Sequence, residues 1–469
     1  MAGEDAETAS RNAARAKVSG VGDGEATEHA RALCEFVGEC PSPYHTVLAI
    51  RARLEACGFV ELSESATWNV LPGGKYYVVR NDSSIIAFAV GSYAYGDTFG
   101  FKVAASHSDS PTYKIKAEEE LGGPGPYVRL NVEGYGGMID RTWLDRPLGV
   151  AGRVLVRQGN VIRRRFVDAD EDLVLIPSLA VHLNRDVNTN GALNRQVDMC
   201  PLFSAAGGPT NADGFVDFGS LLADRLGVAP EDVLGHDLVL VNRQAPTVWG
   251  ANREFLSAPR LDDLQCVYSS LEAFVGARDD SSVLVFACLN NEEVGSGSMQ
   301  GALSTVLPDV MRRASLGLSV DPQAYIRAVS RSFMVSCDNA QAVHPNHAEL
   351  YDEGNRVWLN GGVVVKEAAN QKYCTDAVGR AIFEELCRRA GVPVQRFANR
   401  SDMTGGSTLG NLAQRRVSMH ALDVGLPQLA MHSAYETAGV LDTACMVRAL
   451  REFYDTRLTF GPDGSIAFG

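Results

Sequence analysis

Acidic residues and a histidine stand directly after apolar runs at several places in this chain. Glu292 and Glu293 follow the run LVFACL, His107 and Asp109 follow FKVAAS, and Asp338 ends the run SFMVSC. Adjacent like charges at the end of a buried segment repel each other and lose their hydration. The arrangement therefore requires positive charge nearby.

Each of these signals also has an ordinary alternative. Asp262 and Asp263 in RLDDL lie where a loop enters a predicted helix and could simply cap it, and His432 precedes another predicted helix start. A histidine and aspartate at a strand end often form a solvated turn, and a solvated loop holds two glutamates at little cost. Considered singly, the ordinary alternatives are preferred. His344 and His347 are expected to serve local structure.

The groups share one position that the separate alternatives do not explain. Each follows an apolar strand or lies at a loop–helix junction, and in open α/β sheets such ends converge on one crevice. The combined donors are histidines and carboxylates without cysteine, which suits a pair of divalent ions such as zinc. When two metals lie roughly 3.5–4 Å apart, one carboxylate normally bridges them.

Size and composition restrict the class of protein. The chain has 469 residues, 45% of them hydrophobic and 21% charged, which is typical of a soluble protein with two or three domains' worth of core. The formal net charge of −14 argues against general affinity for nucleic acid or anionic membranes. It does not exclude an acidic substrate, since a local cation acts at contact distance.

The cysteines and the first residues bear on location. Ten cysteines are spread widely without a C-x-x-C pair, which favours a reducing compartment over a disulfide framework. No apolar stretch approaches the ~18 residues that cross a bilayer. Residues 1–26 are small, polar and mixed in charge, so we expect a disordered tail on a cytoplasmic protein. A targeting role for this tail is the alternative.

Periodicity indicates an α/β domain in two pieces. We expect helices at 28–40, 41–59, 215–227 and 376–391, and strands at 75–81, 84–91, 99–107, 281–289 and 332–338. Between them, residues 112–248 show short β-like runs separated by Gly, Pro and Asp. The prediction is a domain formed by 27–111 and 249–469, interrupted by a β-rich insertion.

Six motifs occur in the order found in aspartyl aminopeptidases, and they run through most of the chain: SHSDSP, RLDDL, NNEEVGS, SCDNAQAVHPN, RSDMTGGSTLG and LPQLAMHS. VEGYGG, TWLDRPLGVAGRV and IPSLAVHLNR in the insertion match as well. The chain thus resembles this family of dinuclear zinc exopeptidases from SPYHTV onward. The resemblance implies a zinc-exopeptidase-type α/β/α catalytic domain, an inserted dimerisation domain, and removal of N-terminal Asp or Glu from short peptides.

The resemblance also assigns roles at the metal site. It implies that His107, Asp262 and Asp338 hold one zinc, and that Asp262 bridges to a second zinc completed by Glu293 and His432. Mn²⁺ or Co²⁺ could replace zinc at one of the two positions. Glu292 resembles the general base that takes a proton from a metal-activated water, and Asp109 the partner that orients His107.

Further positions resemble substrate contacts. Lys366, with Tyr373 seven residues on, would bind the acidic side chain, although a lysine after VVV could equally be a surface residue with a buried stem. His182 matches a position that reaches into a neighbouring subunit's active site; the alternative is a strand-edge histidine in the oligomer interface. Gln341 stands where the family often has a histidine, and glutamine donates a hydrogen bond without carrying charge.

The chain departs from the family pattern in two smaller ways: Ser108 stands where threonine is common, and the acidic tail is longer than usual.

The resemblance further implies dimers that close into a twelve-subunit shell. Two competing functions stay open: an aminopeptidase that prefers neutral N-termini, and a non-catalytic particle acting as scaffold or cargo. The sequence disfavours a serine hydrolase and a dinucleotide-binding protein, since it lacks the G-x-S-x-G and G-x-G-x-x-G spacings.

Overall fold

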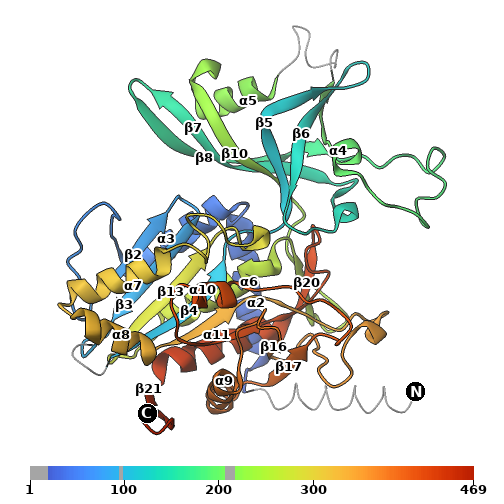
Figure 1. The fold of residues 1–469 in the computed structure, drawn as a ribbon. Helices are drawn as coiled ribbons and strands as arrows, with labels where there is room; N and C mark the ends of the chain where they lie inside the picture. Colours follow the sequence, from blue (N-terminus) through green and yellow to red (C-terminus); the bar gives the residue numbers. More distant parts are fainter. Residues whose placement is uncertain (1–19, 95–98, 206–216) are drawn as a thin grey trace.

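The computed structural model describes residues 20–94, 99–205 and 217–469, which form an α/β unit with a β-barrel standing on it (Figure 1). The boundary predicted for the disordered tail, at residue 26, is too late, because helix α2 (Asp23–Glu39) begins before it and buries Ala26 in the core. Residues 1–19 of that tail lie outside the described residues. Within the described residues, no helix combines the length and apolarity needed to span a membrane.

A nine-stranded sheet forms the centre of the α/β unit. Its strands run in the order β1 (Val60–Glu61), β2 (Lys75–Arg80), β3 (Ser84–Val90), β13 (Val283–Leu289), β4 (Phe101–His107), β14 (Phe333–Cys337), β18 (His420–Gly425), β16 (Val363–Glu367) and β17 (Val394–Ala398). β13, β4, β14 and β18 are mutually parallel. Their carboxyl ends therefore meet at one edge of the sheet, as the sequence predicts.

Helices cover both faces of this sheet, which confirms the predicted α/β/α layering. One apolar core joins the sheet to α2, α3 (Pro43–Ala56), α6 (Leu261–Val275), α9 (Ala377–Ala390) and α11 (Val440–Asp455). The opposite core joins it to α7 (Val306–Gly317), α8 (Pro322–Ser330) and α10 (Leu409–Gln414). Ala104 packs into the first core and Val103 into the second, since successive strand residues point to opposite faces.

The β-rich segment closes into a six-stranded barrel. Its strands are β5 (Thr112–Gly122), β6 (Tyr127–Tyr135), β7 (Pro147–Gln158), β8 (Val161–Leu175), β9 (Leu202–Ala205) and β10 (Val233–Asn242), accompanied by α4 (Arg195–Asp198) and α5 (Phe218–Leu226). The boundary expected at residue 248 is too late. β11 (Thr247–Trp249) pairs with β12 (Phe255–Ala258) of the α/β unit, so the barrel ends at Asn242.

A small sheet beside the strand ends carries two of the site loops. It contains β11, β12, β20 (Glu436–Gly439), β19 (Pro427–Leu429) and β15 (Ala340–Gln341). The chain passes from β12 into α6 at Asp262, and from β19 to β20 through His432. A separate hairpin of β21 (Leu458–Phe460) and β22 (Ile466–Phe468) follows α11. Short 3₁₀ turns are η1 (Asp140–Trp143), η2 (Pro230–Asp232), η3 (Glu292–Val294) and η4 (Ala348–Leu350).

Arg153 of β7 fixes the barrel on the α/β unit. Its guanidinium donates hydrogen bonds to Asp82 of the α/β unit at 2.9 Å and to Asp237 of the barrel at 2.8 Å. The same group lies 4.8 Å from the ring centroid of Tyr44. Because this arginine is buried and has a partner on each side, the barrel is held in one orientation above the strand ends.

Candidate metal centre

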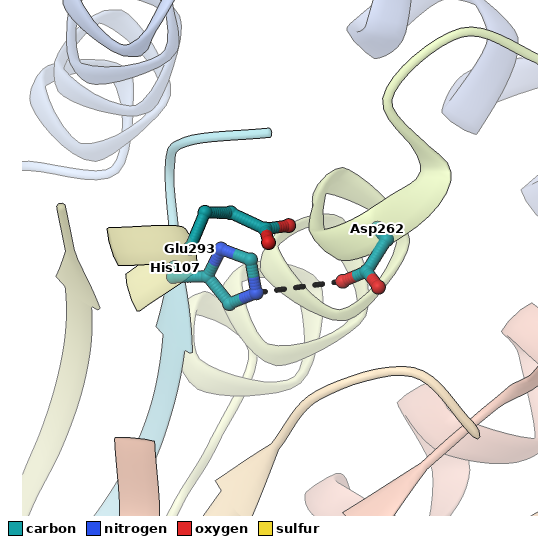
Figure 2. A group of neighbouring side chains, drawn as sticks. All are labelled: His107, Asp262 and Glu293. Atoms are coloured by element: carbon teal, nitrogen blue, oxygen red, sulfur yellow. Dashed lines mark ion pairs between the residues drawn. The ribbon is translucent and has the colours of Figure 1, made fainter. Parts of the chain in front are cut away.

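The residues expected to bind metal meet at the carboxyl edge of the sheet. His107 ends β4, Glu293 lies in η3 after β13, and Asp338 follows β14. Asp262 and His432 approach from the small sheet. All five line one pocket with a volume of about 520 Å³, and Figure 2 shows three of them, from separate elements, gathered around a common space.

Asp262 lies between the two histidines. Its Oδ1 atom is 3.4 Å from Nε2 of His107 (Figure 2). Its Oδ2 atom is 3.7 Å from Nε2 of His432. Nε2 of His432 is also 3.4 Å from Oε2 of Glu293. One carboxylate facing two separate donor groups has the arrangement of a bridging ligand.

The distances do not by themselves divide the ligands between two ions. The ligand atoms of His107, Asp262 and Glu293 lie within 4.8 Å of one another, and so do those of His107, Glu292 and Asp338. These two groups cut across the sets that the family resemblance implies. The distribution of ligands between two ions therefore stays a prediction.

Unsatisfied oxygens show that the site suits a cation. Oδ1 of Asp262, Oδ1 of Asp263 and Oε1 of Glu293 are buried, and none has a hydrogen-bond partner within the part of the chain that the structure describes. A buried acceptor left in this state costs about 1–3 kcal/mol, and more when charged. Histidine nitrogens and carboxylate oxygens without cysteine are ligands that zinc accepts, so the residues present fit this metal.

Burial perturbs the ionisation of the cluster. It raises the pKa of Glu292 to about 8 and that of Glu293 well above its usual range. Burial also raises the pKa values of Asp263 and Asp338. Burial alone would lower the pKa of His107, but the carboxylates around it, with Asp263 foremost, raise it well above its ordinary value. Negative charge is thus in excess among these side chains.

Asp109 fixes the glutamate turn. Its carboxylate accepts hydrogen bonds from the backbone N–H groups of Glu292 and Glu293, both at 3.2 Å. Nδ1 of His107 lies 3.0 Å from the backbone oxygen of Asp109 and 3.5 Å from the carboxylate of Asp109. The expected link to His107 thus runs through the main chain as well as the side chain, and the carboxylate principally orients Glu292 and Glu293.

The barrel contributes residues that the sequence did not single out. The hydroxyl of Tyr135, at the end of β6, donates to Asp109 at 2.6 Å. The carbonyl oxygen of Gly137 lies 2.5 Å from Nδ1 of His432. A side chain at Gly136, where φ is +80°, would meet Glu293 at 3.2 Å. The VEGYGG motif was the available signal, but nothing local indicated that it reaches the site.

Two further carboxylates support the ligands. Glu436, buried in β20, accepts the backbone N–H groups of Asp262 at 3.0 Å and His432 at 2.7 Å. Asp263 accepts the backbone N–H of His107 at 3.1 Å. The helix-capping alternative for the aspartate pair is wrong, because the cap position of α6 is Arg260 and both carboxylates face His107.

Lys366 lies in the wall of the pocket. Its side chain is only 3% exposed, so the surface alternative is wrong. Nζ donates to the backbone oxygens of Asp338 at 2.7 Å and Asn339 at 3.2 Å, and lies 5.3 Å from the ring centroid of Tyr373. Burial alone would lower its pKa, but Asp338 raises it, so the ammonium keeps its charge. Tyr373 and Gln341 line the same pocket.

The remaining histidines lie elsewhere. His182 is exposed in a turn after β8, not at a strand edge, and is not among the residues of this chain that line the pocket. The rings of His344 and His347 are 5.0 Å apart, with His347 near Glu349. Neither lines the pocket, which agrees with a local structural role.

A buried histidine–carboxylate site at the strand ends of an α/β/α unit is characteristic of metal-dependent hydrolases. The model of the aminopeptidase I zinc metalloproteases (M18) matches residues 36–454, and the chain belongs to this family. It is a zinc aminopeptidase, a hydrolase, and the family resemblance seen in its motifs is confirmed.

Known relatives cover nearly the whole chain. A probable M18 family aminopeptidase 2 of Clostridium acetobutylicum is 40% identical over 430 residues, which are 91% of this chain and 99% of the relative. The cryo-EM structure of the Ape4 and Nbr1 complex is similar with a TM-score of 0.88 and 33% identity, covering 92% of this chain and 87% of that one. The structure of the S. cerevisiae mApe1 dodecamer is similar with a TM-score of 0.80 and 28% identity, covering 91% of this chain and 96% of that one.

Proposed function

We propose that this aminopeptidase removes N-terminal aspartate or glutamate from short peptides, using two zinc ions and Glu292 as general base. One observation carries the proposal: the pocket that holds the histidine–carboxylate cluster also contains Lys366, a charged and buried ammonium. A pocket with a cation in its wall favours a substrate side chain of opposite charge.

The two ions are assigned to sets that share Asp262. His107, Asp262 and Asp338 would hold one, and Asp262, Glu293 and His432 would hold the other, with Mn²⁺ or Co²⁺ as replacements at one position. The opposed contacts of the Asp262 oxygens with His107 and His432 support the bridging position of Asp262. Bound zinc supplies two effects, a lower pKa for water and polarisation of the peptide carbonyl.

Glu292 moves the proton. Asp109 accepts the backbone N–H of Glu292, which holds the turn that places the Glu292 carboxylate in the pocket beside the ligands. Without bound cations, burial raises its pKa to about 8; cations beside it would lower that pKa and favour the ionised form that accepts a proton. Its carboxylate takes a proton from the attacking water and gives it to the departing peptide nitrogen.

Lys366 has a second possible role, which the structure also supports. Two of its three N–H groups are already bonded to the backbone of Asp338 and Asn339. A lysine used only to hold this turn would leave the enzyme with a preference for neutral N-termini. Nζ also lies 3.4 Å from Oδ1 of Asp338, so the proposal assigns the substrate carboxylate a share of an ammonium that already faces Asp338.

We expect Glu292→Gln to bind zinc normally and to lose at least about 100-fold in kcat on an aspartyl peptide, because an amide cannot take up the proton. Zinc content by metal analysis and kcat are measured together. Glu349→Gln, a change of the same type on exposed η4, is the control and should keep full activity. Full activity in Glu292→Gln would refute its role as base.

For specificity, we expect Lys366→Ala to lower kcat/KM on Asp- and Glu-initiated peptides by about tenfold to 100-fold, with leucyl peptides affected little, because only acidic substrates lose a charged hydrogen bond. Steady-state assays over a panel of N-terminal residues measure this. Lys116→Ala, on the barrel, is the control. Equal losses for leucyl and aspartyl peptides would assign Lys366 to the Asp338 turn alone.

Assembly into dimers and then a dodecamer is part of the proposal. The segment after β8 exposes apolar side chains that would be costly in an isolated chain: Leu179, Val181, Leu183, Val187 and Val197. Burying them against a neighbouring subunit would also deliver His182 toward that subunit's pocket. The S. cerevisiae mApe1 dodecamer supports this assembly.

We expect sedimentation of the wild-type protein to show an oligomer, and Leu183→Asp to dissociate it, because a charge cannot be buried in an apolar interface. A monomeric wild type would contradict the proposed assembly.

The cytoplasm is the proposed location. All ten cysteines lie among the described residues, most are buried, and none of them forms a disulfide. Free thiols persist in a reducing compartment, where disulfides are rare.

A further inference from the structure

An arginine outside the metal site has two buried nitrogens without a hydrogen-bond partner among the described residues. Arg331 follows the last residue of α8, and its Nε and Nη2 atoms are buried without a hydrogen-bond partner. Leaving such donors unsatisfied is costly, most of all on a charged group. Native structures rarely contain groups of this kind unless a water or an ion completes them.

Arg331 lines a pocket of about 230 Å³ at the opposite edge of the sheet from the metal centre. The pocket lies where β4 and β14 begin, with Phe101 and Phe333 in its wall, whereas His107 is the last residue of β4. The hairpin strand β21 forms another wall, on the side of the α/β unit away from the barrel (Figure 1). It is therefore separate from the pocket that holds the acidic cluster.

The charges around this pocket are not balanced. Lys102 donates to Asp279 at 2.7 Å and to the backbone oxygen of Tyr454 at 2.7 Å, so its charge is already compensated. Arg331 and Arg457 also line the pocket, and neither forms an ion pair with another described residue. Two guanidinium groups beside one pocket, both without an ion-pair partner in the described part of the chain, are unexpected in a protein with a net charge of −14.

We propose that this pocket binds a small oxyanion, a phosphate or carboxylate group, through Arg331 and Arg457. A guanidinium presents planar N–H donors in a fork that matches two oxygens of such a group. The hydroxyl-bearing residues Ser281 and Ser282 line the same space and add neutral polar character. The volume suits inorganic phosphate or a small dicarboxylate and is below that of ordinary drug-sized pockets.

The site does not depend on the proposed peptidase specificity. None of its residues contacts the metal ligands, and the ligand class follows from the guanidinium groups alone. Phosphate and carboxylate share the same recognition chemistry, so the experiment uses one probe of each kind.

Isothermal titration calorimetry of the full-length, zinc-loaded protein tests the proposal, with sodium phosphate and, separately, sodium succinate at constant ionic strength. We expect saturable binding of at least one anion. The anion that binds more tightly shows whether the pocket prefers a phosphate or a carboxylate group. Arg331→Ala should weaken it by about tenfold or more, because it removes charge-assisted hydrogen bonds. Arg457→Ala, at an exposed position, should weaken binding too.

Arg163→Ala is the matched control, an exposed arginine on β8 of the barrel, and should bind as the wild type does. Binding that is the same in wild type, Arg331→Ala and Arg457→Ala would place the anion elsewhere and overturn the proposal. The absence of saturable binding for both anions would also overturn it, since ordered water would then satisfy Arg331. If Arg331→Ala does not fold, unchanged binding in Arg457→Ala overturns the proposal and weakened binding supports it.

Discussion

Repulsion among buried carboxylates is the constraint on which the rest of this structure depends. Seven of them meet at the carboxyl edge of the sheet: Asp109, Asp262, Asp263, Glu292, Glu293, Asp338 and Glu436. Three nearby side chains, His107, His432 and Lys366, provide or accept positive charge. Three such side chains cannot balance seven carboxylates, and burial raises the pKa of most of these carboxyl groups. Zinc, the metal of this family, would offset this excess of negative charge when bound.

The fold is arranged to hold those groups in place. Parallel strands bring three site segments to one edge, and the small sheet brings Asp262 and His432 across from it. Glu436 ties these two loops together through their backbone N–H groups. The barrel closes the arrangement from above, since Tyr135 orients Asp109 and Gly137 contacts His432. The inserted domain thus completes the site as well as forming a separate unit.

The sequence predicted the parts of this site that follow from local pattern. Apolar runs ending in His107, Glu293 and Asp338 identified both the strands and the side chains at their ends. It could not predict Tyr135 or Glu436, because their roles depend on contacts between segments far apart in the chain. The burial of Lys366 was equally hidden, since a lysine after three valines has the same local pattern at a surface. The start of α2 was misplaced because polar residues before Ala26 concealed its buried face.

The central claim is that two cations occupy the carboxylate cluster on either side of Asp262. Anomalous diffraction at the zinc absorption edge, from crystals of the purified protein, tests it most directly. The account predicts two peaks per chain, each within about 2.0–2.2 Å of an oxygen of Asp262. Zinc-loaded crystals with no peak beside Asp262, or with one peak bound by residues outside the cluster, would contradict it.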